Sequence, residues 1–155
     1  MWTGGTQSKN VAIGYNAMSA CTNGSDSNVG IGYSALSGAV AADELIGIGE
    51  YAGSAHTSGT GAIYLGKSAG AANTTGSRNI AIGYQAYDGA DTESDNIAIG
   101  YDALGGAVAG GEKNIAIGNY SLDALTSGVR NTVIGYEAGT DMNTGFYNLI
   151  AGYRA

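Results

Sequence analysis

The sequence predicts an all-β fold, a parallel β-solenoid or β-roll of about nine coils with 17–18 residues each. A short phrase recurs at nearly fixed spacing, and apolar residues alternate within it with a period of two. Asn-Ile-Ala-Ile-Gly-Tyr stands unchanged at 79–84 and at 96–101. A unit this short buries its apolar side chains only against its neighbours, so the units must stack. The glycines of the phrase are Gly14, Gly32, Gly49, Gly66, Gly83, Gly100, Gly118, Gly135 and Gly152.

The repeats define one domain, residues 10–155, preceded by a lead-in of residues 1–9. The chain has 28 glycines and no proline. The lack of proline suits a chain in which nearly every amide donates to a ladder of hydrogen bonds. A formal net charge of −7 argues against nucleic acid and against anionic membrane surfaces as partners. There is no run of 18 apolar residues, and the first residues do not resemble a signal peptide.

The two residues that stand three before and one before each glycine are mostly β-branched, as at Ile80 and Ile82. This spacing predicts a strand on which both columns face the interior. The residue between them points to the opposite face. It is Ala81, Ala98 or Ala116 in three central coils. Because it is small, we expect a close contact there with another coil or with another subunit.

The rest of each unit predicts a corner and a polar loop. Alanine recurs three positions after the glycine and a larger residue often follows it, which indicates a second short strand or a corner lying back over the first. The remaining eight or nine residues are variable and carry most charges, as loops do. Each glycine costs a helix about 1 kcal/mol, so we expect almost no helix.

Parallel stacking places equivalent residues above one another. The asparagines should form a ladder whose amides bond to each other and to corner backbone groups. The tyrosines should form a column broken at Glu50, Lys67 and Asn119. This column is either corner packing or a surface that binds carbohydrate or protein; its members include Tyr84, Tyr101, Tyr136 and Tyr153. The structural repeat residues are Asn79, Ile80, Ile82, Gly83, Asn96, Ile97, Ile99, Gly100, Asn114, Gly118, Asn131, Gly135, Asn148 and Gly152.

The phrase Asn-hydrophobic-Ala-Ile-Gly-x-x-Ala resembles the head repeats of YadA-like trimeric autotransporter adhesins, and similar phrases occur in bacteriophage tail fibres and other virion appendages. The likeness spans about half of each unit along the whole repeat domain. It implies a left-handed parallel β-roll assembled as a homotrimer, with small and aliphatic strand positions at the subunit contacts. Ala81, Ala98 and Ala116 are the candidates for those contacts.

The sequence departs from the adhesin pattern in ways that favour a virion appendage. Its units are somewhat longer, it has no heptad pattern for a stalk, and it shows no signal or membrane anchor. We therefore expect a non-enzymatic structural or adhesive protein: a phage fibre, knob or decoration protein of the virion, made in the host cytoplasm and used in host attachment. The alternatives are the head of a bacterial adhesin at the cell surface, or the subunit of an extracellular filament. Expected partners are copies of itself, other virion or fibre proteins, and a cell-surface glycan or protein receptor.

Enzymatic alternatives have little support in the sequence. A hexapeptide β-helix of the acyltransferase type needs an aliphatic residue every six positions, yet Asp88 and Gly105 stand six after Ile82 and Ile99. No phosphate-binding glycine phrase opens a helix. The single His56 has no evident orienting partner for general-base chemistry, and the single Cys21 has no cysteine to pair with. We expect no cofactor.

One acidic cluster is a candidate Ca²⁺ site. Asp88, Asp91, Glu93 and Asp95 offer oxygen ligands, but their spacing does not match an EF-hand loop. A solvated acidic loop is therefore the default interpretation.

The last copy of the phrase contains Leu149 and Ile150. A terminal coil of a solenoid exposes unpaired N–H and C=O groups and half of a core. We therefore expect Leu149 and Ile150 to take part in axial docking, either with a second copy or with a virion protein.

Overall fold

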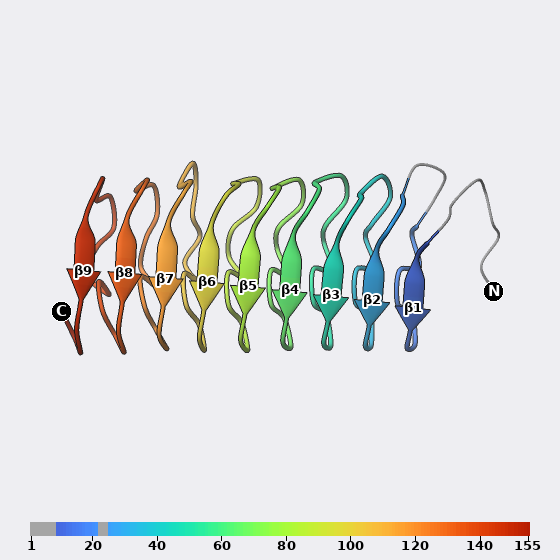
Figure 1. Ribbon diagram of the computed structural model, residues 1–155, viewed down its shortest axis with the longest axis horizontal. Helices are drawn as coiled ribbons and strands as arrows, with labels where there is room; N and C mark the ends of the chain where they lie inside the picture. Colours follow the sequence, from blue (N-terminus) through green and yellow to red (C-terminus); the bar gives the residue numbers. More distant parts are fainter. Residues whose placement is uncertain (1–8, 22–24) are drawn as a thin grey trace.

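The computed structural model describes residues 9–21 and 25–155 and confirms a parallel β-solenoid (Figure 1). Its strands pair in chain order within a single nine-stranded sheet. Equivalent residues face one another across each pair, as Ile80 faces Ile97. The strands are β1 (Val11–Ile13), β2 (Val29–Ile31), β3 (Ile46–Ile48), β4 (Ile63–Leu65), β5 (Ile80–Ile82), β6 (Ile97–Ile99), β7 (Ile115–Ile117), β8 (Thr132–Ile134) and β9 (Leu149–Ala151).

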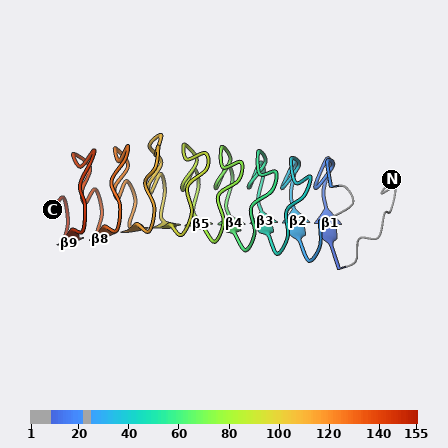
Figure 2. The ribbon, with the colours of Figure 1, turned by 90° about the horizontal axis from the view of Figure 1, so that it is seen from above.

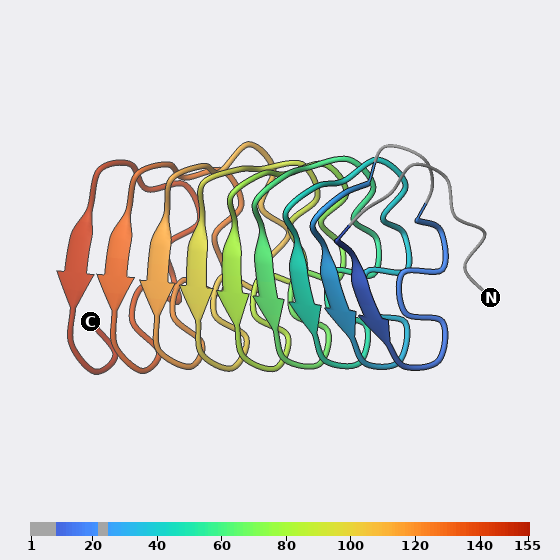
Figure 3. The ribbon, with the colours of Figure 1, turned by 45° about the vertical axis from the view of Figure 1, so that its right-hand side comes forward.

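The coils stack along one axis, with β1 and β9 at opposite ends of the rod (Figures 1 and 3). Each coil contributes one strand to a sheet on one side, and its loop returns on the other side (Figure 2). No helix occurs in residues 9–21 and 25–155, as the glycine content led us to expect. The repeat therefore builds a rod with two different long sides, one of strands and one of loops.

The period-two alternation is present, but the expected orientation of the strand is wrong. The middle residue of β5, β6 and β7 is buried, and the isoleucines on either side of it are only half-buried. Ala81, Ala98 and Ala116 are fully buried in the interior of the chain's own coils. Each coil encloses its interior between two walls, the strand and the segment that follows it. The three alanines contact the opposite wall and neighbouring coils of the same chain, so they offer no surface to another subunit.

The narrow interior explains why the small column faces inward. A Cβ atom added to Gly47 would lie 2.6 Å from Cγ of Leu36, a residue of the opposite wall. Where the strand instead carries Tyr64, the opposite wall carries Gly53, whose added Cβ would lie 2.5 Å from the tyrosine ring. Large residues on one wall thus face small residues on the other. Two walls of large residues would not fit at the packing density of a protein interior.

The second wall is a corner and not a second strand. Leu104 has φ of 51° and Asp102, two residues earlier, has φ of 53°. These left-handed values interrupt an extended chain. The wall still stacks through backbone hydrogen bonds between coils, such as Leu104 N–H to the Ser121 carbonyl at 2.9 Å.

Glycine is required where the strand turns into this corner. Gly83 has φ of 139° and Gly100 has φ of 134°, values that side chains rarely adopt. A Cβ on Gly83 would collide with the carbonyl oxygen of Gly100, and one on Gly100 would lie 2.6 Å from that of Gly118. Both features explain why glycine recurs at this position in every coil.

The asparagine ladder also forms as expected. The amide oxygen of Asn79 accepts the backbone N–H of Asn96 at 2.9 Å, and that of Asn96 accepts the N–H of Asn114 at 2.9 Å. The amide nitrogens before the last one donate to loop carbonyls, as Asn79 Nδ2 does to Glu93 at 2.7 Å, whereas Asn148 Nδ2 donates to Asn131 Oδ1 at 3.0 Å. The ladder continues through Asn131 and Asn148. It satisfies buried backbone groups where loop and strand meet.

Candidate functional site: the apolar face and its two rims

The outer face of the sheet is a long apolar strip, here named the apolar face. It consists of the first and last residues of each strand, and the bulky ones are largely isoleucine, with Thr132 as the polar member. Ile48 remains 40% exposed and Ile134 remains 42% exposed. Parallel sheets are normally covered on both faces, and contiguous exposed apolar surface marks an interaction site. The apolar face is therefore the strongest candidate site on the chain.

One border of the apolar face carries the tyrosine rim, formed by the first and second residues after each repeat glycine. The expected breaks at Glu50 and Asn119 are bridged, because the following residues are Tyr51 and Tyr120. In the longer run, the centroids of neighbouring rings lie 5.4, 4.9, 6.2 and 5.6 Å apart. The rings, in order, are Tyr84, Tyr101, Tyr120, Tyr136 and Tyr153. A shorter run joins Tyr15, Tyr33 and Tyr51 at 5.4 and 5.3 Å.

The remaining break in the tyrosine rim is at Lys67. Its ammonium group lies 3.0 Å from the carboxylate of Glu50 in the preceding coil. Sequence reasoning compared only the position directly after the glycine, so it missed Tyr51 and Tyr120. The signal that could have found them was a tyrosine one residue beyond each gap.

The other border carries the residue just before each asparagine position, here named the cation rim because four of its nine members are basic. Its members are Lys9, Ser27, Glu44, Gly61, Arg78, Asp95, Lys113, Arg130 and Tyr147. Arg78 Nε donates to Asp95 Oδ1 at 2.6 Å, and Arg78 Nη2 donates to Asp95 Oδ2 at 3.1 Å. The Arg78 guanidinium lowers the pKa of Asp95 through this hydrogen bond. Lys113 lies 3.9 Å from the same carboxylate. Arg78, Asp95 and Lys113 have left-handed backbone conformations, with φ of 56° at Arg78. This conformation turns their side chains outward from the coil.

The chain's cations gather around the apolar face. The sequence has six lysines and arginines, of which Lys9, Arg78, Lys113 and Arg130 are on the cation rim. The other two, Lys67 and Arg154, are on the tyrosine rim. A chain with a net charge of −7 thus places its positive charges along the two borders of one apolar strip. Aromatic residues and arginines at the border of an apolar patch are typical of protein interfaces.

The acidic residues of the candidate Ca²⁺ site do not converge. Asp88 accepts a hydrogen bond from Gln85 Nε2 at 3.2 Å, and Asp91 accepts one from Thr74 Oγ1 at 2.5 Å. Asp95 belongs to the cation rim. Within residues 9–21 and 25–155, no three histidine, cysteine or carboxylate side chains lie close enough to hold a metal ion.

Glu93 departs from the expected solvated loop, since its side chain is buried. Its carboxylate accepts backbone N–H groups of Asp91 at 3.1 Å, Thr92 at 3.0 Å and Gly110 at 2.9 Å. Hydrogen bonds to backbone amides stabilise a buried carboxylate. Glu93 therefore organises two adjacent loops.

His56 has a structural environment. Its Nδ1 lies 3.0 Å from the hydroxyl of Tyr64, which donates to Asn73 Oδ1 at 3.1 Å. All three side chains are buried, and burial lowers the pKa of His56 and raises the pKa of Tyr64. No carboxylate takes part in these contacts, and the group packs in the core.

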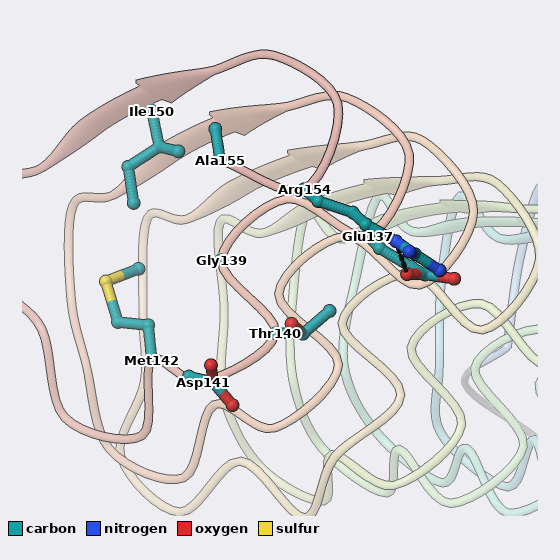
Figure 4. A pocket seen from close by; sticks show the side chains of 8 residues that line it. All are labelled: Glu137, Gly139, Thr140, Asp141, Met142, Ile150, Arg154 and Ala155. Carbon is teal, nitrogen blue, oxygen red and sulfur yellow. Dashed lines mark hydrogen bonds and ion pairs between the residues drawn. The ribbon is translucent and has the colours of Figure 1, made fainter.

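The last coil forms an open cavity of about 540 Å³ (Figure 4). Met142 and Ile150 give it an apolar side, and Glu137 and Arg154 pair at 2.5 Å on another side. Leu149 lies beside it in β9 and is 78% exposed. Figure 4 shows Met142 and Ile150 directed toward the same space.

No family model, curated protein or solved structure matches the chain. Among the described residues there is also no helix with the length and hydropathy needed to cross a membrane.

Proposed function

We propose that this chain is a non-enzymatic structural rod that associates with copies of itself through the apolar face, as a homotrimer. The observation that carries the proposal is the strip of half-exposed isoleucines on a parallel sheet. Burying such a strip between copies supplies the hydrophobic free energy that a single coil stack leaves unused. The trimer is the assembly implied by the resemblance to adhesin heads and phage fibres.

The test is the mass in solution of the chain and of a variant with a charged face. Ile97→Asp together with Ile99→Asp places two carboxylates at the centre of the apolar face. We expect a trimer mass by light scattering for the parent and a monomer mass for the double variant. Thr75→Asp, on an exposed loop, is the matched control and should keep the trimer. A monomer mass for the parent would overturn the proposal.

We further propose that the rod belongs to a virion appendage used in attachment to a cell-surface glycan or protein. A regular, elongated repeat structure supports a role as a spacer or display element. Antibodies raised against the recombinant rod should label phage particles in immunogold microscopy of a producing culture. Labelling confined to the bacterial envelope would instead support an adhesin head, and labelled free fibrils would support a filament subunit.

A further inference from the structure

We propose that the tyrosine rim of one copy docks on the cation rim of the next, and that this pairing sets the copies side by side with their strands parallel. This inference rests on the proposed association through the apolar face, and it adds the orientation of the partner and the residues at the border.

The two rims lie on opposite borders of the same face in every coil. Arg78 comes before the asparagine and β5, and Tyr84 follows the glycine after β5. The register between coils is constant over all nine strands, so each rim runs along the rod without crossing the face. The face therefore has the cation rim, with its four basic residues, on one border and the tyrosine rim on the other.

Symmetry then links the orientation of the copies to the contacts at their borders. When copies are related by rotation about an axis parallel to the rod, the cation rim of each meets the tyrosine rim of its neighbour. When two copies pack face to face in antiparallel orientation, each rim meets its own equivalent. The parallel arrangement gives contacts between unlike rims, and the antiparallel arrangement gives contacts between like rims.

The chemistry of the rims favours contacts between unlike rims. Arg78 uses the edge of its guanidinium for Asp95, which leaves the flat face available for an aromatic ring. The chain already makes such contacts, with Arg130 lying 5.4 Å from the centre of the Tyr147 ring. A cation over an aromatic ring is attracted by the ring quadrupole. In a centred antiparallel pair, Arg78 of one copy would instead meet Arg78 of the other copy, which disfavours that arrangement at the middle coil.

The tyrosine rim also carries two carboxylates, whose charges are offset by cations of the same rim. Glu50 and Glu137 lie among the tyrosines and form ion pairs with Lys67 and Arg154 there. These pairs are at the solvent-exposed border, where their main effect is on partner choice and orientation.

The coil that contains β5 provides a sharp test, because it is the middle coil of nine. It lies opposite the same coil of the other copy whether the two copies are aligned in parallel or in antiparallel orientation. We would replace Cys21 by serine, then make Arg78→Cys in one copy and Tyr84→Cys in another, each with a tag of different mass. The two variants would be co-expressed, purified as mixed oligomers and treated with a mild oxidant or a short bis-maleimide. Disulfides need Cα atoms within about 7 Å, and the linker relaxes that demand.

We expect the covalent product to join one Arg78→Cys chain to one Tyr84→Cys chain, with few or no products between identical variants. Thr75→Cys, on an exposed loop away from the rims, is the control and should give no cross-link to either variant. Products between identical variants, or no mixed product in protein that keeps its oligomeric mass, would overturn this inference while leaving the proposed association intact. A monomer mass in the parent would overturn both.

Discussion

At the scale of single residues, backbone conformation decides which positions tolerate a side chain. Gly83 has φ of 139°, and the carbonyl group of Gly100 occupies the place where a Cβ atom would lie. Gly61 has φ of 68°, and an added Cβ would come only within 3.7 Å of Arg78 Cγ. At the position equivalent to Gly61, the next coils carry Arg78 and Asp95 with φ of 56° and 64°. Two glycines with positive φ are therefore under different constraints.

Gly83→Ala should lower the free energy of unfolding by about 3 kcal/mol or more, because backbone strain adds to the collision. Gly83→Val should be worse, since its side chain is branched at Cβ. Gly61→Ala is the matched control and should change the unfolding free energy by less than about 1 kcal/mol. Urea unfolding followed by circular dichroism measures both. Equal effects of the two substitutions to alanine would contradict this account of Gly83.

His56 should make stability depend on pH. Burial lowers its pKa in the folded state, and hydrogen bonds of the ring to Gly59 and Asn73 offset only part of that effect. The unfolded chain, with an imidazole pKa of about 6.5, therefore binds the proton more readily than the folded chain does. The stabilisation is fully present above that pKa and is lost as the pH falls toward and through the lower folded value.

The measurement is the free energy of unfolding between about pH 7.5 and pH 5 for the parent and for His56→Asn. Asparagine is chosen because Asn73 occupies the equivalent place in the next coil. The parent should lose stability toward pH 5, and the variant should lose less over the same range. Identical slopes for the two proteins would show that His56 does not titrate on unfolding.

At the scale of the strand, the two faces should differ in how well they accept a leucine. Ala98 is fully buried and Ile99 beside it is only half-buried. Ala98→Leu should overpack the interior and lower the free energy of unfolding by about 1–3 kcal/mol. Ile99→Leu keeps the volume and should cost less than about 1.5 kcal/mol. Thermal melting of both variants as isolated rods checks this, and an unchanged melting temperature for Ala98→Leu would mean that the interior is not close-packed there.

At the scale of the whole molecule, the ends and the long face offer different surfaces. Leu149 is largely exposed in β9, and Ile150 faces the cavity of the last coil. We propose axial docking of a second copy or a virion protein at these two residues. Apolar side chains at an open strand edge favour addition of another chain.

Ile150→Glu should release free trimers from longer assemblies, because it places a charge in the cavity of the last coil and not on the apolar face. Light scattering and negative-stain microscopy should show shorter particles, while far-ultraviolet circular dichroism keeps the spectrum of the rod. Thr140→Glu, on the polar side of the same cavity, is the control and should shorten the particles less. Parent protein that shows no axial contact under any condition would contradict the proposal.

The sequence by itself determined the repeat, the parallel stacking of its strands, the asparagine ladder and the positions of the recurring glycines. Each of these follows from chemistry that is local or that repeats in register. Gly83 and Gly100, for example, are needed wherever the chain turns in this way. The basic residues of the cation rim can also be found in the sequence, before four of the asparagines. Their position beside the apolar face became clear only from the structure.

Only the tertiary structure decided which side of the strand is inside. Alternation distinguishes two faces of a strand but does not indicate which one is enclosed. The interior of the coil is too narrow for Ile80 and Ile82, so Ala81 is the residue that is buried there. The same long-range packing separated Asp88 from Asp91 and joined His56 to a tyrosine and an amide in later coils. Such contacts depend on how loops of different length stack. Their partners lie about one coil apart or across the coil, where no local pattern in the sequence relates them.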